Sequence, residues 1–206
     1  DEASRPIRGG LIADDMGLGK TLQVLCVFSF LAARDQLRPS LVIAPLTLLD
    51  NWENEVRKFI PNSVRLPIAR LNQTPRGYES TLAQHDLVLT SYETLARRDV
   101  ELGRIPWKVV VCDEAQKIKN PSTRMAHAAK AMNARLYLGI TGTPVENSLD
   151  ELWSIMDFVQ PGLLGSLLDF RKAYASKAVL DNPSAREAAA TELKSRLAPM
   201  VLRRLK

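Results

Sequence analysis

The residues with the clearest capacity for chemistry stand in a short glycine-rich run, Gly17-Leu18-Gly19-Lys20-Thr21. An apolar stretch that predicts a strand precedes the run, and a stretch that predicts a helix follows it. Glycines in such a turn let backbone N–H groups approach phosphate oxygens, and the start of the helix adds positive potential. In this context Lys20 would reach the β- and γ-phosphates of a nucleotide, and the Thr21 hydroxyl would hold Mg²⁺.

One position departs from the general phosphate-loop pattern. That pattern has a glycine five residues before Gly19, where this sequence has Asp14. The departure weakens a kinase-like or GTPase-like interpretation. The plain alternative is a glycine-rich turn with an incidental Lys-Thr pair, but the strand–helix context favours nucleotide binding.

A second candidate group, Asp113-Glu114, ends the apolar run Val109–Cys112. A phosphate loop needs a metal-binding carboxylate on a neighbouring strand, and open α/β sheets bind ligands at the carboxyl ends of their strands. Asp113 would hold Mg²⁺, directly or through water, and Glu114 would orient and deprotonate the attacking water. Alone, the pair is better interpreted as a solvated strand end; beside Lys20 and Thr21 the catalytic interpretation is favoured.

A third candidate group, Thr141-Gly142-Thr143-Pro144, follows the predicted strand Arg135–Ile140. It is expected at the same end of the sheet as the other two groups. By chemistry alone it is a turn with two hydroxyls, and a structural and a functional role are equally open.

The elements that must position these groups alternate along the chain. Strands are predicted at Leu11–Ala13, Leu41–Ala44, Val64–Ala69 (an edge strand), Asp86–Thr90, Trp107–Cys112 and Arg135–Ile140. Helices are predicted at about Thr21–Arg34, Leu49–Phe59, Pro121–Met132 and Asn147–Val159. Such alternation predicts an α/β fold, with a mostly parallel sheet covered by helices on both faces. The first of these helices is apolar nearly all round, so we expect it to be buried on most sides.

The last part of the chain has a different pattern. Residues 161–206 show helical patterns with a break near Asp181-Asn182-Pro183 and no strand candidate. We therefore expect two parts, an α/β unit over residues 1–160 and a helical appendage over 161–206.

Composition excludes several classes of protein. The 206 residues are 46% hydrophobic and 25% charged, as in an ordinary soluble globular protein. No apolar run is long enough to span a bilayer, so no membrane partner is expected. The 2 cysteines and 2 histidines are too few and too scattered for a disulfide framework or a zinc site, and a reducing compartment is the default.

The net charge of +5 is not spread over the chain. Basic and acidic residues balance over residues 1–160, so the excess lies in residues 161–206. A diffuse basic face is not supported. An anion-attracting end and an ordinary solvated helical surface remain equally open.

Taken together in their order, the motifs resemble those of the Swi/Snf-like ATPases, double-stranded-DNA translocases of the second helicase superfamily. The motifs that carry the resemblance are Asp14–Thr21, Leu41–Leu46 with Asn51–Glu55, Leu89–Leu95, Asp113–Asn120, Thr141–Pro144, Glu146–Ser154 and Leu202–Lys206. The resemblance covers nearly the whole chain from Gly9. It implies a RecA-like P-loop NTPase lobe that binds ATP and Mg²⁺.

The resemblance also implies roles for single residues. Asp14 stands where this family itself lacks the first glycine, and Gln116 replaces the more usual histidine of motif II. The nucleotide-binding residues would be Asp15, Met16, Gly17, Leu18, Gly19, Lys20 and Thr21. Residues that couple nucleotide state to DNA contact would be Gln116, Thr141, Gly142 and Thr143. Residues that contact the DNA backbone, with little sequence preference, would be Pro45, Leu46, Thr47 and Leu48.

The resemblance further implies that this chain is one lobe of a larger motor. ATP is cleaved between two RecA-like lobes in such enzymes, and this sequence contains neither the second lobe with its arginine fingers nor the upstream glutamine motif. Residues 161–206 would be a helical insertion and a crossover segment toward the second lobe. We expect the chain alone to be catalytically incompetent. The full-length protein would be an intracellular DNA-dependent ATP hydrolase, in the cytoplasm or nucleoid of a prokaryote or the nucleus of a eukaryote, that remodels protein–DNA complexes.

Two other functions remain open at this stage. An RNA helicase lobe has a similar plan, but Thr141–Pro144 and the Asp14–Thr21 loop argue against it. A non-catalytic nucleotide-sensing module is disfavoured because Lys20, Thr21, Asp113 and Glu114 are all intact. The protein–DNA complex on which the motor acts is not encoded in these motifs.

Overall fold

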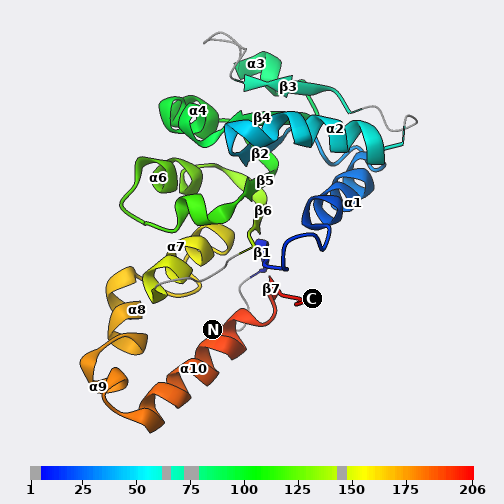
Figure 1. Cartoon of the computed structure of the whole chain (residues 1–206). Helices are drawn as coiled ribbons and strands as arrows, with labels where there is room; N and C mark the ends of the chain where they lie inside the picture. The colour runs from blue at the N-terminus through cyan, green and yellow to red at the C-terminus, as the bar shows by residue number, and fades with distance from the viewer. Residues whose placement is uncertain (1–5, 62–65, 72–78, 143–147) are drawn as a thin grey trace.

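A single parallel sheet forms the centre of the molecule in the computed structural model, which describes residues 6–61, 66–71, 79–142 and 148–206. Its seven strands lie in the order β3-β4-β2-β5-β6-β1-β7, and every neighbouring pair is parallel (Figure 1). The strands are β1 Gly9–Ile12, β2 Ser40–Ala44, β3 Ile68–Arg70, β4 Leu87–Ser91, β5 Trp107–Asp113, β6 Ala134–Ile140 and β7 Val201–Leu202. The predicted α/β fold with a parallel sheet is confirmed.

Helices cover both faces of this sheet, as predicted. They are α1 Lys20–Ala32, α2 Leu49–Phe59, α3 Glu79–Leu82, α4 Tyr92–Arg97, α5 Asp99–Gly103, α6 Arg124–Lys130, α7 Leu149–Val159, α8 Leu167–Tyr174, α9 Lys177–Leu180 and α10 Pro183–Leu197, with two 3₁₀ turns, η2 Leu46–Leu48 and η4 Ala115–Ile118. Figure 1 shows α1 and α2 on one side of the sheet and α4, α6 and α7 on the other.

The central strand β5 shows how the two faces are built. Val110 and Cys112 belong to the core under α4, α6 and α7, whereas Val109 and Val111 belong to the core under α1 and α2. Alternate residues of a strand point to opposite faces, so a continuous apolar run fills two cores at once. This is the physical reason why the uninterrupted run in the sequence predicted a strand buried on both faces.

Most predicted elements are present, with ends shifted by a few residues. The short elements α3, α4, α5, η2, η4 and β7 were not predicted. One of them had a readable signal, because the Ser91 side chain accepts a hydrogen bond from the Thr94 N–H and so caps α4. The predicted edge strand is observed as β3, which lies at one edge of the sheet. Two of its predicted residues, Val64 and Arg65, lie outside the described residues.

The prediction that α1 is buried on most sides is wrong. Val24, Leu25 and Phe28 are buried, but Leu22, Val27 and Phe30 are 40%, 36% and 56% exposed. Apolar residues on every side of a helix are compatible with burial, but each side is buried only if another helix or strand packs against it. In the described part of the chain, the side of α1 turned away from the sheet stays exposed.

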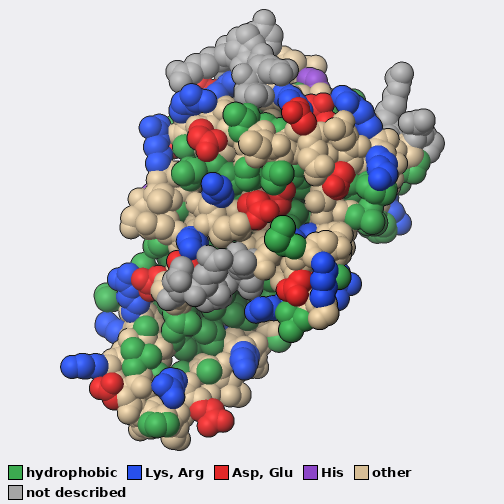
Figure 2. All heavy atoms as spheres, in the orientation of Figure 1, with side chains coloured by type: hydrophobic (Ala, Val, Ile, Leu, Met, Phe, Trp, Pro, Cys, Tyr) green, Lys and Arg blue, Asp and Glu red, His purple; other side chains and the backbone are tan. Residues whose placement is uncertain are grey.

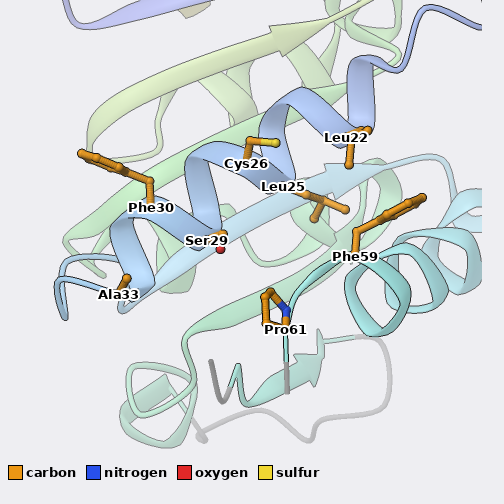
Figure 3. Close-up of a pocket in the computed structure, with 8 residues that line it drawn as sticks. All are labelled: Leu22, Leu25, Cys26, Ser29, Phe30, Ala33, Phe59 and Pro61. Carbon is orange, nitrogen blue, oxygen red and sulfur yellow. The ribbon is translucent and has the colours of Figure 1, made fainter. Parts of the chain in front are cut away.

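A groove runs beside this exposed side of α1. Residues of α1 and the end of α2, including Leu22, Cys26, Phe30, Phe59 and Pro61, line a space of about 440 Å³ (Figure 3). The groove is apolar and lies on the α1 and α2 side of the sheet.

The C-terminal helices do not form a purely helical appendage. Phe170 and Tyr174 of α8 and Leu193 of α10 share one core with the residues under α4, α6 and α7. After α10 the chain returns to the sheet, where β7 pairs with β1 through Leu11↔Val201 and Ile12↔Leu202. Two residues are too few for a strand pattern to be visible in the sequence. The division at residue 160 stays a prediction.

Charges of both signs are mixed on the described surface that Figure 2 shows. This agrees with the balance of basic and acidic residues over residues 1–160. Among the described residues, no helix is both long and apolar enough to cross a bilayer.

Candidate functional site

The carboxyl ends of three strands bring the predicted site residues together. This end of the sheet is the edge at which the site lies. Ile140, the last residue of β6, is in register with Ile12 of β1 on one side and with Asp113 of β5 on the other. The segments after Ile12, Asp113 and Ile140 therefore leave the sheet side by side. They are the glycine-rich loop, the Asp113-Glu114 pair and the Thr141-Gly142 turn.

The glycine-rich loop needs backbone conformations that favour glycine. Gly17 and Gly19 have φ angles of 86° and 72°, in the left-handed region. Gly19 is also the residue before α1, and among the described residues no side chain caps the first turn of that helix. The loop thus presents backbone N–H groups at a helix start, which is the arrangement that binds phosphate.

Lys20 lies folded over this loop. Its Nζ donates hydrogen bonds to the backbone oxygens of Asp14, at 2.8 Å, and Asp15, at 3.1 Å. A Cβ built on Gly142 would lie 3.9 Å from the same Nζ, so the loop and the Thr141-Gly142 turn are neighbours in space. Burial raises the pKa of Asp113, and the charge of Lys20 is the last of several influences that act on this carboxyl group, in the opposite direction.

Asp14 anchors the start of the glycine-rich loop by hydrogen bonds to Gln23 and Arg204. Its carboxylate is fully buried and accepts hydrogen bonds from Gln23 Nε2 at 3.0 Å and from the Arg204 guanidinium at 2.6 Å. The hydrogen bond from Arg204 is the main reason why the pKa of Asp14 is lowered to about 2. The residue that departs from the general phosphate-loop pattern is therefore an ionised anchor in this fold.

Asp113 is held by three donors. Trp52 Nε1 donates to Oδ2 at 2.8 Å, the Glu114 N–H donates to Oδ1 at 2.9 Å, and the Tyr92 hydroxyl donates to the Asp113 backbone oxygen at 2.7 Å. Burial raises the pKa of Asp113, and the hydrogen bond from Trp52 opposes that effect. Asp113 as a whole residue is 7% exposed at the end of β5, and its carboxylate is fixed in orientation.

Glu114 is connected to the Thr141 turn by side chains. Gln116 Nε2 donates to Glu114 Oε2 at 2.5 Å, and the Thr141 hydroxyl donates to Gln116 Oε1 at 2.8 Å. Glu114 has a φ of 51°, which is unusual for a residue with a side chain and is typical of functional sites. The predicted coupling residue Gln116 thus contacts the predicted base directly, and Thr141 reaches that base through Gln116.

The donors at this edge fit Mg²⁺ better than a transition metal. Among the described residues there is no group of three or more His, Cys, Asp and Glu side chains that could hold a metal. Mg²⁺ is usually bound through one or two carboxylates, a hydroxyl and substrate phosphates, so Asp113 and Thr21 suit it.

The predicted DNA-contacting residues also emerge at this edge. They follow β2, whose Ile43 is in register with Cys112 of β5. Pro45 precedes η2, where Leu46 is 58% exposed and Thr47 is exposed, and η2 continues into α2 at Leu49. Another predicted coupling residue, Thr143, lies outside the described residues.

Sequence reasoning missed four residues of this site. Trp52, Tyr92 and Arg204 stood within motifs that carry the resemblance but had no role of their own, and Gln23 was not singled out. Trp52 and Arg204 are 61 and 190 residues away in sequence from the carboxylates that they contact. No local spacing could reveal such contacts.

Comparisons with known proteins agree on one family. A family model described as the SNF2-related domain matches residues 2–206. The chain is 41% identical to the Zorya protein ZorD of Escherichia coli, over 96% of this chain and 20% of that protein. It is 37% identical to the putative ATP-dependent helicase/translocase YwqA of Bacillus subtilis, over 96% of this chain and 21% of that protein. The chain thus spans about a fifth of the length of these relatives.

Solved structures show the same likeness. The SWI2/SNF2 ATPase core of Sulfolobus solfataricus in complex with dsDNA matches with a TM-score of 0.83 and 44% identity, over 97% of this chain and 40% of that one. A structure of the core domain from the same organism matches with a TM-score of 0.82 and 43% identity, over 96% and 39%.

Proposed function

The chain belongs to the SNF2-related family, and from this premise we propose that it is the ATP-binding lobe of a DNA-stimulated ATPase. The full-length protein would move along double-stranded DNA and remodel protein–DNA complexes. The observation that supports this most is the meeting of Lys20, Asp113, Glu114 and Thr141 at one edge of the sheet.

The chemistry is hydrolysis of the γ-phosphate of ATP by water. Backbone N–H groups at Gly17 and Gly19 bind the phosphates, and Lys20 moves from its backbone partners to the phosphate oxygens. Asp113 and Thr21 would hold Mg²⁺, which when bound would neutralise charge that develops on the phosphates. Glu114 accepts the proton of the attacking water. The hydrogen bonds from Trp52 and the Glu114 N–H keep the Asp113 carboxylate in place during this step, and the bond from Tyr92 holds its backbone.

The exposed turn after β2 is the part of the chain that would contact DNA. The structural relative was solved with double-stranded DNA, and the motif resemblance assigns the DNA contact in this chain to Pro45–Leu48. Contacts from such a turn to the phosphate backbone carry little sequence information. The hydrogen-bonded path from Glu114 through Gln116 to Thr141 would relate DNA contact to hydrolysis.

A second RecA-like lobe in the full-length protein is part of the proposal. Phosphoryl transfer needs positive charge on both sides of the γ-phosphate, and an arginine finger contributes roughly 10³–10⁵ in rate where it has been removed from related sites. The 206-residue chain alone is therefore expected to bind nucleotide weakly and to hydrolyse it very slowly.

The deciding experiment is steady-state phosphate release by the full-length protein with duplex DNA, with RNA, and without nucleic acid. Stimulation by duplex DNA alone supports the proposal. Stimulation by RNA instead would identify an RNA helicase. Nucleotide binding without any turnover would identify a sensing module.

A further inference from the structure

Trp52 makes a contact that links two elements with separate proposed tasks. It lies in the first turn of α2, is fully buried, and donates its indole N–H to Asp113 Oδ2 at 2.8 Å. Asp113 ends β5 at the proposed hydrolytic site, whereas α2 continues directly from η2, the proposed DNA-contacting turn.

We propose that Trp52 is a positioning residue that orients the Asp113 carboxylate for Mg²⁺ and makes that orientation depend on the position of the Pro45–Leu48 segment. The inference rests on the proposed function, because it assigns a metal-binding role to Asp113. It goes beyond that function by naming the side chain through which DNA contact would reach the metal site.

The geometry of Asp113 supports the first half of the proposal. The N–H of Glu114 engages Oδ1 and Trp52 engages Oδ2, so the carboxylate cannot rotate without breaking a hydrogen bond. Each carboxylate oxygen accepts more than one bond, so these contacts leave acceptor capacity for an ion. Mg²⁺ demands near-ideal octahedral geometry, so its affinity is sensitive to the orientation of a ligand. Partners that orient a metal ligand change metal affinity or activity by roughly 10–100-fold when removed.

The packing of α2 supports the second half. Leu49, Trp52 and Val56 are buried on one side of the helix, while Leu46 and Thr47 just before it are exposed. A force on the exposed turn therefore acts on a short, rigid element whose first turn carries Trp52. A small shift of that turn moves Trp52 with it and so changes the distance from the indole nitrogen to Asp113.

The chain provides a matched control. Trp107 is also buried and also donates its indole N–H, but to the backbone oxygen of Leu102 at 2.9 Å, at the start of β5 rather than at its end. Trp52→Phe and Trp107→Phe each remove one buried indole hydrogen bond. Only the first removes a contact with the proposed metal ligand.

The experiment uses the full-length protein and two readouts. Mn²⁺ replaces Mg²⁺ as a spectroscopic probe, and its binding with a non-hydrolysable ATP analogue is titrated by electron paramagnetic resonance. ATP hydrolysis is measured in parallel against Mg²⁺ concentration, with and without duplex DNA. Trp52→Phe should weaken Mn²⁺ binding and raise the half-saturating Mg²⁺ concentration by about tenfold, with hydrolysis recovering at high Mg²⁺. The effect of DNA on the Mg²⁺ requirement should also disappear.

Two outcomes would overturn the inference. Equal Mn²⁺ affinities for Trp52→Phe, Trp107→Phe and wild type would remove Trp52 from the metal site. A persistent effect of DNA on the Mg²⁺ requirement in Trp52→Phe would remove it from the coupling. Wild-type protein that binds Mn²⁺ and nucleotide but shows no DNA-stimulated hydrolysis would instead contradict the proposed function, and the Mn²⁺ titration would still decide the role of Trp52.

If Trp52→Phe does not fold, 3-benzothienylalanine at position 52 keeps the shape of the ring and has sulfur in place of the N–H. The expected loss of Mn²⁺ affinity is the same for that variant, and wild-type affinity would contradict the proposal.

Discussion

Arg204 donates two hydrogen bonds from its guanidinium to one carboxylate oxygen of Asp14, at 2.6 Å from Nη2 and 3.1 Å from Nε. Its backbone N–H donates to the other oxygen at 2.8 Å. Asp14 precedes the glycine-rich loop, and Arg204 follows β7, which extends the sheet beside β1. The pair therefore fixes the residues 201–206 against the loop that would bind phosphate.

The first prediction follows from the charge of Asp14. Its pKa is lowered from 3.8 to about 2, mainly by the hydrogen bond from Arg204, so the folded protein binds this proton less well than the unfolded chain does. The resulting stabilisation is complete above about pH 4 and is lost as the pH falls toward 2. Asp14→Asn should lower the free energy of unfolding at neutral pH. Denaturant titrations at several pH values should show this difference shrinking as the pH falls below 4.

The pair Arg171–Asp150 is the control for this prediction. Its closest distance is also 2.6 Å, but the Asp150 side chain is 31% exposed whereas Asp14 is 0% exposed. Exposed ion pairs contribute little to stability because solvent screens them. Asp150→Asn should therefore change the unfolding free energy less than Asp14→Asn, and an equal effect would contradict the role of the buried anchor.

The second prediction concerns Lys20, the cation that the loop holds beside Gly142. Lys20→Ala in the full-length protein should lower ATP turnover by at least about 10²-fold, because a preorganised charge on the transferring phosphate is lost. Steady-state phosphate release measures this. Lys172→Ala, at a lysine that is 70% exposed on α8, should leave turnover unchanged. Wild-type turnover in Lys20→Ala would exclude a phosphate-binding role.

The third prediction separates binding from chemistry at Glu114. Glu114→Gln should keep nucleotide affinity and lower turnover by about 10²–10⁴-fold, because the amide cannot accept the proton of water. Fluorescent-nucleotide binding and phosphate release are measured on the same preparation. Glu93→Gln, at an exposed residue of α4, serves as the control. If Glu114→Gln turns over normally, another group is the base.

The site was predictable from sequence where a motif stands directly after a strand. Asp113 ends β5, Thr141 follows β6, and the loop before Lys20 follows β1. The carboxyl ends of these parallel strands meet at one edge of the sheet. Pattern and topology together therefore placed three motifs in one location without any contact information. The parallel sheet was predictable for the same reason, since its strands are continuous apolar runs.

The remaining contacts depend on packing that has no periodic signal. Trp52 has the spacing of a core residue of α2, and nothing in that spacing shows that its indole N–H meets Asp113. Arg204 lies in a strand extension of two residues that is too short to produce a pattern. The exposed side of α1 shows the opposite failure, because its apolar residues predicted burial. Among the described residues the Arg34 guanidinium lies 3.6 Å from the centre of the Phe30 ring, yet Phe30 is still 56% exposed.

The fourth prediction concerns the contact between Thr141 and Gln116. Thr141→Val keeps the shape of a fully buried side chain and removes the hydroxyl that donates to Gln116. ATP hydrolysis without DNA should change by less than about fivefold, whereas stimulation by duplex DNA should be largely lost. Thr90→Val is the control, since Thr90 is also fully buried and, within the described part of the chain, its hydroxyl donates only a long hydrogen bond of 3.4 Å to the Ser91 backbone oxygen. Normal stimulation in Thr141→Val would remove this path from the coupling.

The fifth prediction concerns the exposed turn at Pro45–Leu48. If this turn lies against the DNA backbone, a negative charge at Thr47 repels phosphate whatever the base sequence. Thr47→Asp in the full-length protein should lower affinity for two unrelated duplexes by the same factor, about tenfold at low salt, and should make the salt dependence less steep. Fluorescence anisotropy titrations at several salt concentrations measure both quantities. Thr191→Asp places the same charge at an exposed residue of α10, at the opposite end of the molecule from α2 (Figure 1). Equal effects of the two variants would show a general charge effect, and a loss of affinity for one duplex alone would contradict contact through the backbone.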